Sequence, residues 1–134
     1  MRDRDLVFGW SVVLGAVLIL IGVLGFVNNP LIGAPANNPV AVTGTIHDMV
    51  HLATGAIALY IAFGLRGRGQ AMALIGLGVV YLVFVVLTIL SPNLFGILNY
   101  PVNGVDHLIH AAIGVVSIAI GYLGRSRRTV AAAA

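Results

Sequence analysis

Four long apolar runs, separated by short polar or turn-rich segments, dominate the pattern of the chain. Each run has about 20 residues, the length that an α-helix needs to cross the hydrocarbon core of a bilayer. None of them alternates between polar and apolar residues, as the strands of a membrane β-barrel do. The pattern therefore predicts an all-α membrane protein with four transmembrane helices, at about residues 6–27, 46–65, 71–90 and 105–123.

The positions of proline and the overall composition agree with this prediction. All five prolines fall between the predicted helices, where a fixed φ and a missing N–H do no harm. Only 8% of the residues are charged, against about 25% in soluble domains, so a soluble globular protein is excluded. The absence of cysteine excludes disulfides and thiolate metal sites. We expect a single integral membrane domain over residues 1–134, with the lipid bilayer as its main surroundings.

The basic residues predict the orientation of the chain in the membrane. All seven are arginines, and they precede the first predicted helix, separate the second from the third, or follow the fourth: Arg2, Arg4, Arg66, Arg68, Arg125, Arg127 and Arg128. In a chain with four spans these three places lie on one side of the membrane. The positive-inside rule makes that side cytoplasmic, so that the N and C termini are both predicted inside. Orientation explains the arginines without a nucleic-acid partner.

The chain also contains an internal repeat. Residues 47–55 align with residues 106–114, so that His51 matches His110 and Gly55 matches Gly114. Because each half has two spans, the chain is predicted to form two tandem helical hairpins. Their pseudo-twofold axis would run along the membrane normal, which gives the second and fourth helices equivalent positions.

The repeated stretches carry a resemblance to a known family. The sequence His-Asp-x-x-His-Leu at residues 47–52 opens the second helix, and Asn-Gly-Val-Asp-His-x-x-His at residues 103–110 opens the fourth. With the two glycines that follow, these motifs resemble small bacterial four-helix integral membrane proteins grouped as a domain of unknown function. That family typically has His-x-x-x-His in the first motif and Asp-x-x-x-His in the second, with asparagine more usual where Asp48 and His107 stand. The resemblance implies the four-helix fold and a bacterial inner-membrane location, and it names no reaction.

The polar residues inside the spans gather at one place. All four histidines and two of the four acidic residues fall in the first two turns of the second and fourth predicted helices. A spacing of four places His47 over His51 and Asp106 over His110, and polar groups in a span are expected to face the bundle interior. Imidazole and carboxylate suit Zn²⁺ and other first-row ions. We therefore hypothesise a divalent metal site formed by His47, His51, Asp106 and His110.

Asp48 and His107 are candidates for a second layer around the site, and the two aspartates also fit a helix cap. Asp48 and His107 lie one residue away from the hypothetical ligands, where they could orient them from a second layer. Asp48 also stands three residues after Thr45, and Asp106 stands three after Asn103. This spacing is typical of a helix N-cap followed by an acid at the third helical position.

The cluster leaves several functions open. It could be a hydrogen-bonded network that docks the hairpins, a metal site, a passage for protons or small solutes, or a haem site with His51 and His110 as axial ligands. Gly55 and Gly114 are interpreted as helix-packing positions. The sequence contains no known catalytic motif. The expected function is a non-enzymatic structural or accessory membrane component, with a transport or electron-transfer component as the alternative, as a homo-oligomer or within a larger complex.

Overall fold

The computed structural model describes the backbone of residues 2–133 and the side chains of residues 6–125. In this part of the chain four long helices form a bundle: α1 (Arg2–Leu24), α2 (Thr45–Phe63), α3 (Gly67–Leu90) and α4 (Gly104–Ala133). Each helix contains a segment long and apolar enough to span a membrane. The prediction of an all-α membrane protein with four spanning helices is confirmed.

Four helix ends differ from their predicted positions by three residues or more. α1 begins at Arg2 rather than near residue 6. α1 stops at Leu24, and the Asn29 side-chain amide donates a hydrogen bond of 2.8 Å to the carbonyl of Leu24, so that the chain turns away. α3 begins at Gly67 rather than near residue 71. α4 continues to Ala133 through a segment rich in arginine and alanine, because both residues have high helix propensity.

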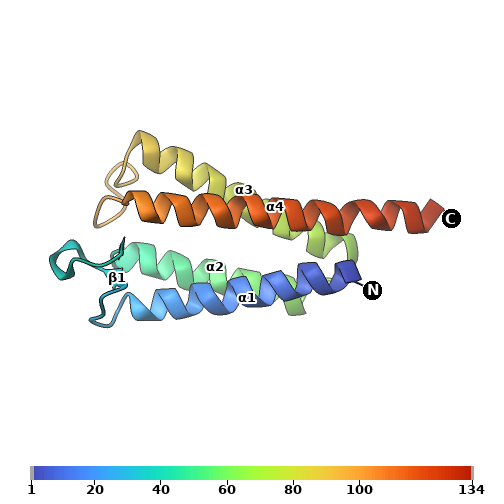
Figure 1. Ribbon diagram of the computed structural model, residues 1–134, viewed down its shortest axis with the longest axis horizontal. Coiled ribbons are helices and arrows are strands. Elements are labelled where there is room, and N and C mark those ends of the chain that lie inside the picture. The colour runs from blue at the N-terminus through green and yellow to red at the C-terminus, as the bar shows by residue number, and fades with distance from the viewer. Residues whose placement is uncertain (1, 134) are drawn as a thin grey trace.

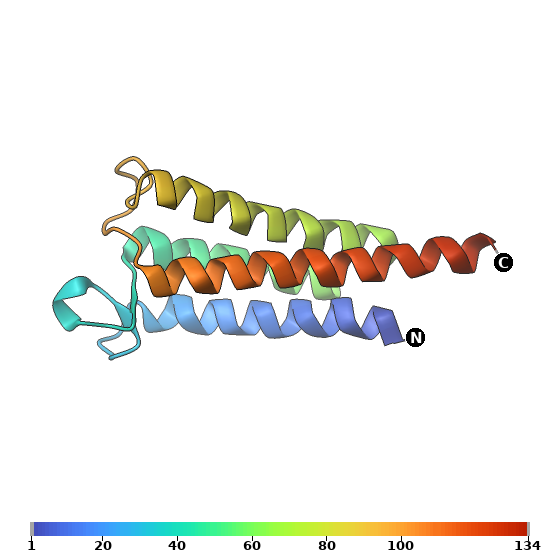
Figure 2. The ribbon, with the colours of Figure 1, turned by 45° about the horizontal axis from the view of Figure 1, so that its top comes forward.

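The helices pair as two hairpins. α1 packs mainly on α2, and α3 packs mainly on α4, while contacts between the two pairs are fewer. Figures 1 and 2 show the pairs side by side, with both ends of the chain at one end of the bundle. We call the opposite end, where residues 25–44 and 91–103 connect the helices, the loop end. The tandem arrangement predicted from the internal repeat is therefore present.

Glycines allow the two helices of each hairpin to approach closely. A Cβ atom added to Gly55 would lie 3.0 Å from the carbonyl oxygen of Gly15, and one added to Gly114 would lie 3.0 Å from that of Gly78. Small residues that bring backbones together are typical of helix packing in membranes. The two glycines matched by the repeat thus occupy matching contacts in the two hairpins.

The interface between the hairpins combines an apolar core with a few polar bonds. Trp10 donates from Nε1 to Ser117 Oγ at 2.9 Å, which joins α1 to α4. The hydroxyls of Thr54 and Tyr81 lie 3.0 Å apart and join α2 to α3. The buried core around these bonds consists of Val7, Leu14, Leu18, Ala58, Ile61, Leu74, Leu77 and Tyr81.

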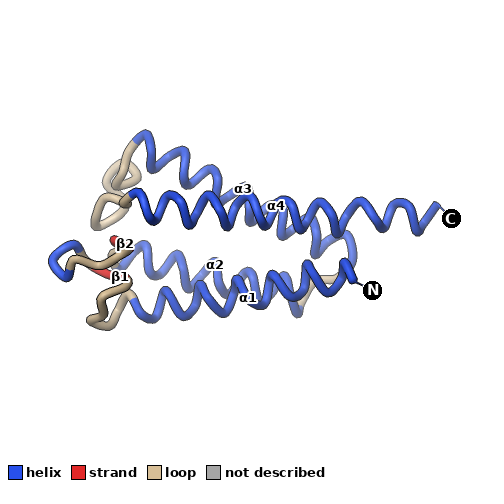
Figure 3. The backbone as a smooth tube through the Cα atoms, in the orientation of Figure 1, coloured by secondary structure: helices blue, strands red, loops and turns tan. Residues whose placement is uncertain are grey.

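A small sheet covers part of the loop end. Strand β1 (Ile32–Gly33) pairs in parallel with β2 (Ala41–Val42), and the 3₁₀ helix η1 (Pro35–Asn37) lies between them in sequence. Figure 3 shows the two strands at the loop end, next to the start of α2. Ile32 of β1 and Ala41 of β2 are both buried, so the sheet directs apolar side chains toward the bundle.

Two asparagines tie the loop of one hairpin to the other hairpin. Asn103 donates from Nδ2 to the carbonyl of Val40 at 3.0 Å. Asn99 Oδ1 accepts the backbone N–H of Ile46 at 3.1 Å. These bonds fix the starts of α2 and α4 relative to each other, and the histidines lie on those two starts.

Candidate metal centre

The first turn of α4 has the cap that the sequence predicts. Asn103 Oδ1 accepts the backbone N–H of Asp106 at 3.0 Å. The Asp106 carboxylate makes no return bond to the cap, since its Oδ2 atom has no hydrogen-bond partner. Asp106 is therefore available to the histidines.

The first turn of α2 differs from the prediction. Thr45 is already helical, the N-cap is Gly44, and no side chain of the cap residue bonds to the helix. The predicted capping by Thr45 and Asp48 is therefore wrong. The acceptor comes from Asn99 of the other hairpin, which bonds to Ile46, so no pattern within α2 itself could reveal it.

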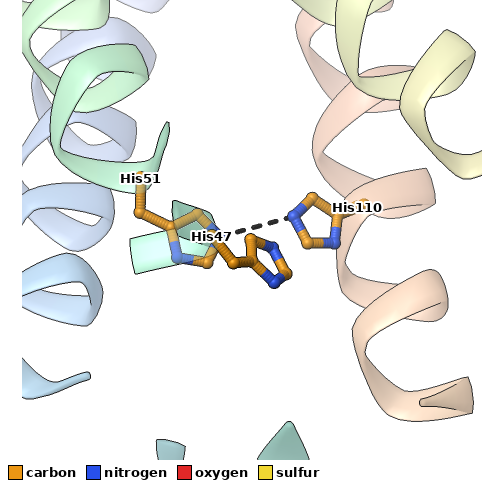
Figure 4. Close-up of side chains that lie close together, drawn as sticks. All are labelled: His47, His51 and His110. Carbon is orange, nitrogen blue, oxygen red and sulfur yellow. Dashed lines mark hydrogen bonds between the residues drawn. The ribbon is translucent and has the colours of Figure 1, made fainter. Parts of the chain in front are cut away.

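Three imidazoles meet where the two helix starts face each other. His47 and His51 of α2 and His110 of α4 are each buried, and one ring nitrogen from each lies within 4.8 Å of the others. His51 Nε2 and His110 Nε2 are 3.4 Å apart. Figure 4 shows the rings of the two helices turned toward one another across the gap between the hairpins. We call these three residues the histidine triad.

A backbone bond fixes the protonation pattern of His110. Its Nδ1 atom lies 2.7 Å from the carbonyl oxygen of Asp106. Because a carbonyl oxygen only accepts hydrogen bonds, Nδ1 carries the proton in the neutral ring. The lone pair of His110 is therefore on Nε2, the atom that faces His51, and a metal-binding histidine commonly has this arrangement.

Asp106 joins the triad as the nearest carboxylate. Its Oδ2 atom is 3.8 Å from His47 Nε2 and 3.4 Å from His110 Nδ1, and all three side chains are almost completely buried. Asp106 thus lies beside one histidine of each hairpin. The four residues proposed from the sequence as ligands lie together in one buried cluster.

The cluster contains an unusual number of unsatisfied polar atoms. Buried polar side-chain atoms in proteins almost always have a hydrogen-bond partner. In the described part of the chain five such atoms have none: Thr43 Oγ1, His47 Nε2, Asp48 Oδ1, His51 Nδ1 and Asp106 Oδ2. Three of the five, on His47, His51 and Asp106, belong to the cluster. The cluster therefore has free bonding capacity that the protein itself does not use.

The charges of the cluster are also unbalanced. Asp48 and Asp106 are 1% and 3% exposed, and they are the only acidic residues among residues 6–125. The arginines in that range lie away from the cluster, since Arg66 and Arg68 are at the connection of α2 to α3 and Arg125 is in the second half of α4. Buried carboxylates without a compensating charge are costly. A cation bound at the loop end would therefore offset the cost of burying these carboxylates in their charged form.

Aromatic residues of α3 enclose the triad. The ring of Tyr81 stacks on His110 with a centroid distance of 5.4 Å, and Phe84 lies 4.9 Å from the same ring. The sequence analysis missed both residues. Tyr81 is the only tyrosine in the third apolar run, and its place in the middle of a span is the one signal that could have revealed it.

The remaining predicted residues point elsewhere. His107 bonds from Nε2 to Thr88 Oγ1 of α3 at 3.0 Å. Asp48 lies against α1, where a Cβ atom on Gly25 would collide with its carboxylate. The Thr43 hydroxyl lies near the Asp48 carboxylate. The two groups do not form a hydrogen bond, because Thr43 Oγ1 and Asp48 Oδ1 are both without a partner.

Gly55 and Gly114 also face away from the triad. The space left by their missing side chains is filled by α1 at Gly55 and by α3 at Gly114. They therefore bring the helices of each hairpin together rather than leaving room for a ring beside the histidines.

Comparison with known proteins places the chain in a family. A profile of the family described as a domain of unknown function (DUF4383) matches residues 10–123. Since this range covers most of the chain and both histidine motifs, the chain belongs to that family. No curated protein and no solved structure is significantly similar to it.

Proposed function

We propose that this member of the DUF4383 family is a small membrane component that binds one divalent first-row metal ion, such as Zn²⁺, at the histidine triad. His47, His51 and His110 supply nitrogen ligands, and Asp106 supplies the fourth. The observation that carries the proposal is the group of buried, partnerless atoms at the place where the three imidazoles meet. The role that we propose is structural or accessory rather than enzymatic.

The spacing of the ligand atoms supports an ion at this position. With bonds of about 2.0–2.1 Å to a tetrahedral zinc ion, two ligand atoms lie about 3.3–3.4 Å apart. The distance between His51 Nε2 and His110 Nε2 is 3.4 Å, and that between His47 Nε2 and Asp106 Oδ2 is 3.8 Å. The first distance is that expected for two ligands of one tetrahedral ion, and the second is slightly longer, so Asp106 would have to move toward the three imidazoles to complete the set.

A purely hydrogen-bonded network fits the cluster less well. If no ion is bound, His51 Nε2 must donate to His110 Nε2, because the only proton of the neutral His110 ring is on Nδ1. His47 Nε2 and Asp106 Oδ2 would then keep no partner, and a buried network with unsatisfied members is costly. An ion would engage both atoms and would also offset the buried negative charge.

Haem fits the distance between the histidines less well than a single ion. Two axial nitrogens in line through one metal would be about 4 Å apart, at about 2 Å per bond. His51 Nε2 and His110 Nε2 are closer than this, and their rings lie at 14° to each other with a centroid distance of 5.6 Å. The ring of His47, 4.5 Å from that of His51, crowds the same space.

Metal titration tests the proposal. Protein purified in detergent and treated with a chelator is titrated with Zn²⁺ by calorimetry, and its metal content is measured by elemental analysis. We expect about one equivalent of zinc in the parent protein and less than about a tenth in the His51→Ala/His110→Ala variant, because both helices lose a ligand.

His107→Ala is the matched control for this titration. His107 lies on the same helix as His110 but bonds to Thr88 on α3, so this variant should keep about one equivalent of zinc. A parent protein that binds less than about a tenth of an equivalent would refute the metal site. If His107→Ala lost as much bound zinc as the His51→Ala/His110→Ala variant, the loss would reflect a general effect of removing a histidine and not the loss of specific ligands.

We further propose that the protein lies in a bacterial inner membrane with both termini in the cytoplasm, which places the triad toward the outer surface. The clustering of arginines at the end that holds the termini supports this orientation. Reporter fusions at Gly67 and at Asn37 test it. A cytoplasmic signal at Gly67 and a periplasmic one at Asn37 are expected, and the reverse pair would overturn the orientation.

A further inference from the structure

A cavity of about 180 Å³ lies beside the triad, in the seam between α1 and α4. Leu18 of α1, Ala41 of β2 and Ile113 of α4 form part of its apolar wall. His51, Asp106 and His110 line the same cavity and give it a polar end. The cavity therefore combines an apolar body with the polar groups of the proposed metal centre.

The mouth of the cavity is apolar. Leu31, Val40 and Ile109 line the cavity and are also 55%, 56% and 41% exposed, so they form its rim. The rim includes no charged residue. In a membrane-spanning bundle such a rim admits a molecule dissolved in the lipid, and it disfavours a sugar or a free anion.

The volume limits what can enter. An apolar protein cavity of about 150 Å³ holds one benzene molecule. A cavity of about 180 Å³ therefore has room for one six-membered ring with one or two small substituents.

The polar end favours a ligand that donates a hydrogen bond. Asp106 Oδ2 is buried without a partner, and a carboxylate oxygen accepts hydrogen bonds. His110 Nε2 is already paired with His51 Nε2 in the metal-free protein, so Asp106 is the acceptor left for a ligand. A hydroxyl group can donate to the Asp106 carboxylate, whereas a carbonyl group has no hydrogen to donate.

We propose that this cavity binds the ring of a hydroxyl-bearing aromatic molecule, a phenol or the head group of a quinol, that enters from the lipid between α1 and α4. The inference goes beyond metal binding, because the ring can occupy the cavity with or without an ion. In the metal-free protein the hydroxyl donates to Asp106.

Fluorine NMR of two small probes tests the proposal. Metal-free protein in detergent is titrated with 4-fluorophenol and, separately, with fluorobenzene, which has the same ring without the hydroxyl. We expect saturable binding of 4-fluorophenol that is at least about tenfold tighter than that of fluorobenzene, because a hydrogen bond to a charged group is lost without the hydroxyl.

Variants that fill the cavity separate binding from partition into detergent. Ala41→Leu and Ile113→Phe add side-chain volume from the loop and from α4, and both leave the histidines in place. Each should weaken 4-fluorophenol binding at least about tenfold and still bind zinc as the parent does, which also shows that the variant is folded.

Several outcomes would overturn the inference. Equal signals from the parent and from both filled variants would mean that the probes only enter the micelle. Equal affinity for both probes would exclude recognition of a hydroxyl and point to a purely apolar occupant. Zinc binding is measured on the same protein preparations. A protein that binds the probe but no zinc would refute the metal site alone, and one that binds zinc but no probe would refute the ring site alone.

Discussion

The contacts within each hairpin and the contact between the two hairpins use different chemistry. Within the hairpins, Gly15 meets Gly55 and Gly78 meets Gly114 through direct backbone approach. Between the hairpins, at the loop end, His51 meets His110. His47, His51 and Asp106 in this cluster each have a buried polar atom without a hydrogen-bond partner. The first kind of contact is complete without a ligand, and the second is not. The backbone contacts are thus internal to the hairpins, and the proposed binding site lies where the hairpins join.

The largest effect that separates these contacts should come from the ion itself. At free Zn²⁺ of about 100 times the dissociation constant, the free energy of unfolding should rise by about 2.7 kcal/mol, because the ion binds only the assembled cluster. Thermal denaturation followed by circular dichroism measures the shift. Asp106→Asn should reduce the shift, since it removes the carboxylate of the cluster.

The metal-free Asp106→Asn protein sharpens the same prediction. Replacing an uncompensated buried charge by a neutral side chain of similar shape should leave the metal-free protein at least as stable as the parent. A variant that is much less stable without metal, or that zinc stabilises as strongly as the parent, would contradict a metal-binding role for Asp106.

A somewhat smaller effect is expected within a hairpin. In Gly78→Ala the new methyl group would lie 2.7 Å from the backbone oxygen of Gly114, so α3 and α4 must separate. We expect a loss of about 1–3 kcal/mol in the free energy of unfolding. Gly76→Ala is the matched control, because nothing lies within 4 Å of a Cβ atom there.

The Gly76 control should be neutral or slightly stabilising, by up to about 1 kcal/mol, because alanine favours the helix. Thermal unfolding of both variants gives the comparison. Equal destabilisation at positions 76 and 78 would mean that close approach of α3 and α4 does not decide the stability of the hairpin.

The cap that crosses between the hairpins should contribute less. Asn99→Ala removes the acceptor for the backbone N–H of Ile46 and should cost about 1 kcal/mol. Hydrogen exchange at the start of α2 should increase at the same time. Asn28→Ala is the control, since the Asn28 side chain makes no hydrogen bond in the described part of the chain. Unchanged exchange at Ile46 in Asn99→Ala would rule out the cap.

The smallest effect is expected at the polar bond between α2 and α3. Tyr81→Phe removes the bond to Thr54 and should cost about 0.6 kcal/mol, the average for hydrogen bonds between helices in membranes. Tyr60→Phe, at a position that is 63% exposed, is the control and should have no effect. A loss of several kcal/mol at Tyr81 would mean that the hydroxyl also supports the triad.

The sequence alone determined the four spans, the tandem hairpins and the choice of His47, His51, Asp106 and His110 as neighbours. It could do so because apolar length, the helical spacing of four and an internal repeat are local or periodic properties of a chain. Buried polar residues in a span must also face one another, so their types and positions already implied one shared cluster.

The tertiary structure alone decided which atoms of the cluster are satisfied and which are free. The cap from Asn99, the packing of Tyr81 and Phe84 on His110, and the cavity behind Asp106 all join segments that are far apart in the sequence. The role of Asp48 was also decided by the tertiary structure. Its carboxylate packs against Gly25 instead of capping α2, because α2 begins at Thr45 and the end of α1 comes close to Asp48. Such contacts depend on how two hairpins dock, and no local pattern in either hairpin encodes that geometry.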